Sequence, residues 1–145
     1  MGMFNAMDVA ATGMTAQQLR MDIISQNIAN ANSTRGEGGD VYRRKTVVMA
    51  EKNQTAFGNV LETCMGQPYS GVKITTIATD MSDLKMVYDP DHPDADENGY
   101  VSYPNVDTVQ EMTDMIDASR SYEANVTAFE AAKAMASKGL ELMSR

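Results

Sequence analysis

The sequence is short of the side chains that catalysis and metal binding usually require. It has one cysteine, one histidine and no tryptophan in 145 residues. Nucleophilic catalysis needs a nucleophile, a base and an orienting group, and a zinc site needs about four ligands, mostly nitrogen or sulfur. Nothing near Cys64 resembles a base, and His92 lies among Asp and Pro residues that are typical of a turn. We therefore expect no catalytic residues, no zinc site and no cofactor.

Long apolar runs are also missing. No stretch approaches the ~18 apolar residues that a membrane-spanning helix needs. The first ten residues contain no Lys or Arg, and Asp8 and Thr12 interrupt any apolar segment, so we expect no cleavable signal peptide. A single cysteine excludes an internal disulfide. These absences are typical of a cytoplasmic protein, but they also fit export by a machinery that reads an uncleaved N-terminus.

Basic residues are outnumbered, and the net charge is −8. This charge argues against nucleic acid as a partner, because phosphate binding needs a basic face. Residues 80–98 hold seven acids and one base, whereas residues 35–52 hold five bases and three acids. The two segments could meet across a subunit boundary and set its register, or both could be solvated surface.

Two short segments partly match ligand-binding motifs, and neither match is complete. The glycines of residues 36–40 lack the spacing and the lysine of a phosphate-binding loop. Residues 94–102 match the first half of a calcium loop, but its twelfth position is Asn105 and Pro104 stands where the exiting helix should begin. We expect no metal site here and interpret the segment as a tight Asp/Asn turn. A calcium-responsive regulatory or interaction module is the alternative.

Both ends of the chain carry the spacing of amphipathic helices, with apolar residues every three or four positions. Helices of about thirty residues would reach ~45 Å, which is longer than a domain of this size is wide. The stripes should therefore bury each other and, beyond that, contact other copies or other proteins. The first stripe contains Met3, Met7, Ala10, Met14, Met21, Ile24 and Ile28, and the second contains Val109, Met112, Ile116, Tyr122, Val126, Phe129, Ala136, Leu140 and Met143.

The middle of the chain predicts short strands. Residues 41–49, 72–79, 84–88 and 100–103 are rich in β-branched or alternating side chains, and the turn residues of 89–99 separate the last two. We predict an α+β fold in which the terminal helices pack as an antiparallel, coiled-coil-like pair. A small β module, a hairpin or three strands, is inserted between them. The expected segments are residues 1–34, with a helix that ends near Asn32, residues 35–104, and residues 105–145. The last helix should begin near Asn105 or Asp107, where Asp107 and Gln110 resemble a capping box.

Five segments resemble the rod and hook family of bacterial flagellar axial proteins. Residues 21–34 (MDIISQNIANANST) are similar to the N-terminal signature of that family, and residues 42–45 follow as in its proximal-rod members. Residues 88–101 and 103–107 are similar to one proximal-rod subunit in particular. Residues 111–128 resemble the C-terminal helix of the family.

The resemblance implies a structural subunit of the periplasmic flagellar rod, exported by the flagellar type III apparatus without a cleaved signal peptide. Its implied partners are copies of itself, other subunits of the proximal and distal rod, inner-membrane ring and rod-adaptor proteins, and the export apparatus. No nucleic acid and no small-molecule substrate are expected. The candidate assembly residues are Met7, Met14, Met21, Ile24, Asn27, Ile28, Asn30, Asn32, Met112, Ile116, Tyr122, Val126, Phe129 and Leu140.

Overall fold

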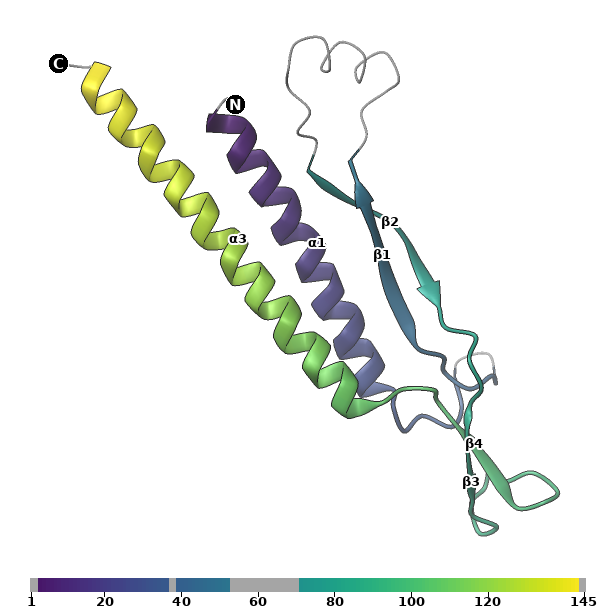
Figure 1. Cartoon of the computed structure of the whole chain (residues 1–145). Helices are drawn as coiled ribbons and strands as arrows, with labels where there is room; N and C mark the ends of the chain where they lie inside the picture. The colour runs from purple at the N-terminus through teal and green to yellow at the C-terminus, as the bar shows by residue number, and fades with distance from the viewer. Residues whose placement is uncertain (1–2, 37–38, 53–70, 144–145) are drawn as a thin grey trace, which may run out of the picture.

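The computed structural model describes residues 3–36, 39–52 and 71–143, and it has the predicted α+β architecture (Figure 1). Two long helices lie antiparallel, and short strands connect them. Within the described residues no helix is long and apolar enough to cross a membrane. The elements in chain order are α1 (Met3–Ala29), β1 (Lys45–Glu51), β2 (Val72–Thr79), β3 (Lys85–Tyr88), β4 (Tyr100–Tyr103) and α3 (Thr108–Met143).

Small residues make the contact between α1 and α3. Ala118 and Ala132 of α3 are buried, and α1 is the only described helix or strand against which α3 packs. On α1, a Cβ added to Gly13 would lie 2.9 Å from Nδ2 of Asn125 in α3. The glycine therefore marks a close approach of the two helices. On α3 the buried apolar positions are alanines, where the sequence pattern suggested larger side chains.

The first helix ends earlier than the sequence suggests, and the last helix begins where it was expected. We expected the first helix to reach about residue 32, but it ends at Ala29. There Nδ2 of Asn30 donates to the carbonyl of Gln26 at 2.8 Å, which satisfies an orphan carbonyl of the last turn. The last helix begins at Thr108, and Oδ1 of Asp107 accepts from the backbone N–H of Val109 at 3.0 Å. Asp107 is thus the N-cap that its position predicted.

The strands form two separate antiparallel pairs, β1 with β2 and β3 with β4, where we expected one hairpin or three strands. β1 also begins at Lys45 and not near residue 41. At the start of β1, side chains accept from the backbone N–H groups. The N–H of Arg44 donates to Oδ1 of Asn105 at 2.9 Å, and that of Lys45 donates to Oδ1 of Asn27 at 3.0 Å.

The β1–β2 pair lies along α1, so that α1 is between this pair and α3 (Figure 1). Along β1, Val47 and Met49 are half-buried while Thr46 and Val48 are exposed. Gly71, with φ +75°, brings the start of β2 against α1, and the N–H of Val72 donates to Oγ1 of Thr12 at 3.1 Å. The β3–β4 pair projects beyond the end of the helix pair (Figure 1).

Two glycine-to-alanine changes test the close approach of the helices. Gly139→Ala should raise the free energy of unfolding by up to about 1 kcal/mol, because alanine favours a helix and nothing lies within 4 Å of the added Cβ. Gly13→Ala should give no such gain and should lower stability, because the Cβ displaces the Asn125 amide. Urea unfolding followed by circular dichroism measures both. An equal gain from the two substitutions would contradict the packing described above.

Candidate functional site

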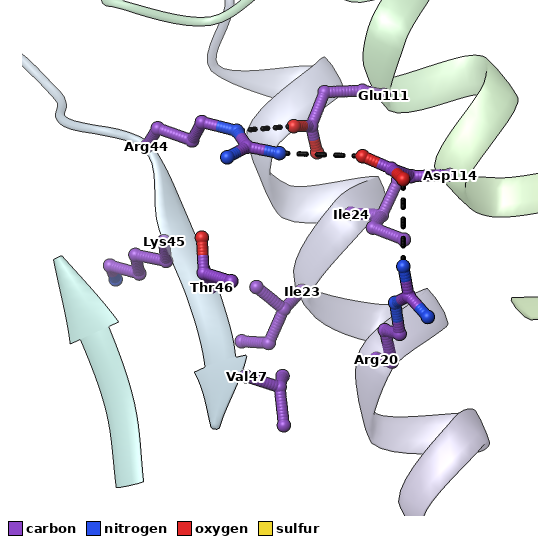
Figure 2. A pocket seen from close by; sticks show the side chains of 9 residues that line it. All are labelled: Arg20, Ile23, Ile24, Arg44, Lys45, Thr46, Val47, Glu111 and Asp114. Carbon is purple, nitrogen blue, oxygen red and sulfur yellow. Dashed lines mark hydrogen bonds and ion pairs between the residues drawn. The ribbon is translucent and has the colours of Figure 1, made fainter. Parts of the chain in front are cut away.

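A buried polar cluster lies where the end of α1, the start of β1 and the first turn of α3 meet (Figure 2). Its centre is Glu111, whose side chain is 0% exposed. Oε1 of Glu111 is 2.6 Å from Nε of Arg44, and its Oε2 accepts from Nδ2 of Asn27 at 2.9 Å. One carboxylate therefore connects the two helices and the first strand. We call Asn27, Tyr42, Arg44 and Glu111 the polar junction.

Asn27 uses all of its side-chain hydrogen-bonding groups in this junction. Its Nδ2 donates to the carbonyl of Lys45 at 2.8 Å as well as to Glu111. Its Oδ1 accepts from the hydroxyl of Tyr42 at 2.9 Å and from the N–H of Lys45. Because the residue is 1% exposed, an unpaired amide here would cost stability. Asn27 thus holds the end of α1 against the start of β1.

Two further charged residues, Arg20 and Asp114, lie beside the junction. Oδ2 of Asp114 is 3.4 Å from Nη2 of Arg44, and its Oδ1 is 3.5 Å from Nη2 of Arg20 (Figure 2). These pairs are partly exposed and longer, so each contributes less than the Glu111 pair. The adjoining cavity measures about 40 Å³, which leaves room for water but not for a substrate. The arrangement is suited to fixing geometry and not to chemistry.

The polar junction also shifts the pKa of Tyr42. Burial raises the pKa of the Tyr42 hydroxyl, and the negative charge of Glu111 raises it further. Both effects disfavour the phenolate, which would place a second negative charge beside a buried carboxylate.

Apolar side chains are exposed on the opposite side of α3. Val109, Met112 and Ile116 are 74%, 53% and 53% exposed. Since Glu111 and Ala118 face α1, the helical period places these three side chains on the side of α3 that points away from α1. We call them the outer stripe. An apolar stripe of this kind on one face of a helix marks a surface for protein contact.

Asp94 and Asp96, in the turn that leads into β4, already have partners. Oδ1 of Asp94 is 2.6 Å from Nη2 of Arg35, and its Oδ2 accepts from the hydroxyl of Thr34 at 2.8 Å. Oδ1 of Asp96 accepts from the N–H groups of Asn98 and Tyr100, both at 2.9 Å. The part of the chain that the structure describes contains no group of three or more His, Cys, Asp or Glu residues placed to hold a metal. Nothing therefore supports the calcium alternative.

Comparisons with known proteins agree with this picture of a structural part. Residues 7–36 match the family described as flagella basal body rod protein, and residues 97–142 match the family described as flagellar basal body rod FlgEFG protein C-terminal. The flagellar basal-body rod protein FlgC of Bacillus subtilis is 44% identical over 96% of this chain and 97% of its own length. Those of Borreliella burgdorferi and Salmonella typhimurium are 42% and 38% identical over 98–99% of each chain. The chain belongs to the FlgC family. It is a structural protein of the flagellar basal-body rod, as its resemblance indicated.

The structure distributes the candidate assembly residues of this FlgC-family protein over three environments. The buried ones, Ile24 and Asn27, contact other parts of the same chain. The exposed ones are Asn32, Met112, Ile116 and Leu140. Half-buried positions are Met7, Met14, Met21, Ile28, Asn30, Tyr122, Val126 and Phe129.

Sequence reasoning missed Arg44 and Glu111 as partners. Glu111 lies in the first turn of α3. From the sequence alone it is interpreted as an exposed acid that the helix dipole favours at this end. Glu111 lies seven residues before Ala118 and therefore on the same helix face, but only the structure shows that this face is buried. An acid on the buried face of a helix requires a cation, and Arg44 lies within a basic run.

Removing the charge of Glu111 tests the junction. Glu111→Gln should lower the free energy of unfolding by about 2–3 kcal/mol, because it leaves Arg44 without its closest counter-charge and can turn an amide N–H₂ toward the Asn27 donor. Glu141→Gln is the matched control on the same helix. It weakens an exposed pair with Lys138, in which the side chains are 66% and 76% exposed, and should change stability by less than about 0.5 kcal/mol. Equal effects in chemical denaturation would show that the junction contributes no special stability.

The raised pKa of Tyr42 predicts a loss of stability in alkali. The folded chain holds this proton more tightly than the unfolded chain, whose tyrosines titrate near pH 10. The contribution is therefore complete below about pH 10 and is lost as the pH rises through the folded pKa. Tyrosinate absorbance should show a late-ionising component that is missing in Tyr42→Phe. A titration curve of the same shape in the variant would contradict the assignment.

Proposed function

We propose that this rod protein is a subunit of the proximal rod that assembles helically, with itself and with other rod subunits, through its terminal helices. The observation that carries the proposal is the outer stripe of Val109, Met112 and Ile116. Burying a few hundred Å² of such surface at ~25 cal/mol per Å² contributes several kcal/mol per contact before ordering costs. A head-to-tail contact that repeats without closing generates a helical filament.

The half-buried candidates support the same proposal. On α1, Met14, Met21 and Ile28 each keep part of their surface exposed beside the helix pair. On α3, Val126 and Phe129 do the same. Methionine adapts to irregular surfaces and to more than one partner, which suits a subunit that meets both its own kind and different neighbours. We assign these positions, with Met112, Ile116 and Leu140, to contacts between subunits.

The family resemblance supports the finer parts of the proposal. These are a periplasmic location and export through the flagellar type III apparatus. They also include contacts with the inner-membrane ring, with rod-adaptor proteins and with subunits of the distal rod. The proposal gives the chain no catalytic activity, no cofactor and no small-molecule substrate. The polar junction would then serve to hold the helix pair in the shape that the rod lattice requires.

A charge in the outer stripe tests the proposal. Ile116→Asp should abolish swimming and the formation of rods, because a carboxylate would be buried without a partner between subunits. The amount of protein and its helix content should stay normal, since this side chain is already 53% exposed in the single subunit. Swimming assays, immunoblots and electron microscopy of basal bodies measure these outcomes.

Thr127→Asp is the matched control for that experiment. Thr127 is exposed and lies about three turns further along the same side of α3, where charged residues surround it. This variant should swim and build rods as the wild type does. Normal rods containing Ile116→Asp would show that the outer stripe is not an assembly surface.

A further inference from the structure

The connection between β3 and β4 contains Asn98, which is the only asparagine of the chain that a glycine follows. Asparagine is one of the chemically labile residues of proteins. The backbone nitrogen of the next residue can attack the side-chain carbonyl carbon of an asparagine and displace its amide as ammonia. Glycine hinders this attack least because it has no Cβ. The pair of Asn98 and Gly99 is therefore the position of this chain where the sequence favours deamidation most.

The carboxamide of Asn98 is accessible in the folded chain. The residue is exposed, and its backbone N–H donates to Oδ1 of Asp96 at 2.9 Å. Its side chain makes no hydrogen bond with the residues that the structure describes. No contact within this part of the chain therefore holds the amide that would leave.

The attacking nitrogen, that of Gly99, is restrained. Its N–H donates to the carbonyl of Asp96 at 3.0 Å, and the Gly99 carbonyl accepts from the N–H of Asp89 at 2.9 Å. Gly99 has a φ of +79°, and a Cβ added to it would lie 3.0 Å from Cε2 of Tyr88. The nitrogen must lose its proton and approach Cγ of Asn98 before it can react. The turn therefore has to open first, and its opening free energy slows the reaction.

The carboxylate of Asp96 closes this turn. Its Oδ1 accepts from the N–H groups of Asn98 and Tyr100, both at 2.9 Å, so the residues on either side of Gly99 are held by one oxygen. Side-chain acceptors of this kind stabilise turns. Loss of the carboxylate should therefore make the turn open more often.

We propose that Asn98 is a deamidation site whose rate is set by the turn that Asp96 closes. After hydroxide removes the proton of the Gly99 nitrogen, this nitrogen forms a bond to Cγ of Asn98, and the side-chain amide takes up a proton and leaves as ammonia. Water then opens the succinimide at one of its two carbonyl carbons, so that residue 98 becomes aspartate or isoaspartate. Either product adds a negative charge beside Glu97, and isoaspartate also lengthens the backbone where Gly99 is closely packed.

Timed incubation of the full chain at mildly alkaline pH, followed by tryptic peptide mapping with mass spectrometry, tests the proposal. Trypsin releases residues 86–120 as one peptide that contains both Asn98 and Asn105. Asn105 is the internal control, because the β-branched Val106 hinders attack and Nδ2 of Asn105 donates to Oγ of Ser82 at 2.7 Å. Asn98 should convert about tenfold faster in urea than in the folded chain, and in urea it should convert faster than Asn105.

Three substitutions separate the effect of the turn from the effect of charge. Asp96→Ala should speed the conversion of Asn98 several-fold in the folded chain. Asp96→Asn keeps an acceptor oxygen and should stay near the wild-type rate. Asp91→Ala removes the same charge from an exposed position of the same connection and should leave the rate unchanged. Circular dichroism checks that each variant keeps its helices.

Three results overturn the inference. The first is an Asn98 that converts no faster than Asn105 in urea, which means that it is no deamidation site. The second is an equal rate for Asn98 in the folded and the urea-treated wild-type chain. The third is an equal rate in the wild type and in Asp96→Ala with intact helices. If Asp96→Ala does not fold, a several-fold faster conversion in folded Asp96→Asn than in Asp91→Ala contradicts the role of the acceptor oxygen instead.

Discussion

The fold depends on one buried carboxylate, that of Glu111. A charge with 0% exposure is costly unless it is paired, and here Arg44 and Asn27 pair it from two other elements. The remaining contact between the helices includes the buried Ala118 and Ala132 and the close approach at Gly13. Small side chains allow close packing, but they specify register weakly because one alanine can replace another after a slip along the helix. The polar junction supplies that register. A slip of one turn would leave a buried charge without a counter-charge.

The buried polar groups are hydrogen-bonded within the chain, whereas several apolar side chains remain exposed to solvent. Asn27 uses every hydrogen-bonding group of its side chain within the chain, whereas Val109 and Leu142 are more than two-thirds exposed. In a protein that acts alone this division would be a liability, because exposed apolar stripes promote association. In a rod protein it separates two tasks. The buried junction sets the shape of the subunit, and the exposed stripes are available for contacts between subunits.

The sequence predicted the helices well because their apolar spacing extends over many turns. It also predicted the alternation of residues 72–79, since one face of that strand lies against α1. Ala10 and Ile24 of the expected first stripe are buried, but the sequence did not predict which apolar residues of α3 face inward. On α3 the stripe that includes Met112 and Ile116 has a regular spacing, yet Ala118 and Ala132 make the contact with α1. Periodicity identifies a face of a helix, but only the tertiary contact decides what covers that face.

The sequence did not predict the strand pairing, and the reason is different. The start of β1 depends on Asn27 and Asn105, which are far from it in sequence and occupy its first N–H groups with side-chain acceptors. Local patterns carry no information about such long-range partners. The same holds for Glu111. Its position at a helix start predicts a solvated charge, and only the structure shows Arg44 beside it. Reasoning from the sequence therefore missed the junction but found the stripes, because a junction joins distant residues and a stripe lies on one element.

The uneven charge along the molecule favours one polarity of association. The acids of residues 80–98 lie mostly at the end that carries the β3–β4 pair, and the described segment after residue 131 carries two lysines and one acid. Two copies that meet through their acidic ends bring like charges together at short range, where salt screens them least. Contacts between unlike ends avoid this repulsion. An elongated subunit with one acidic end is therefore biased toward head-to-tail order, the arrangement that extends a rod and does not close a dimer.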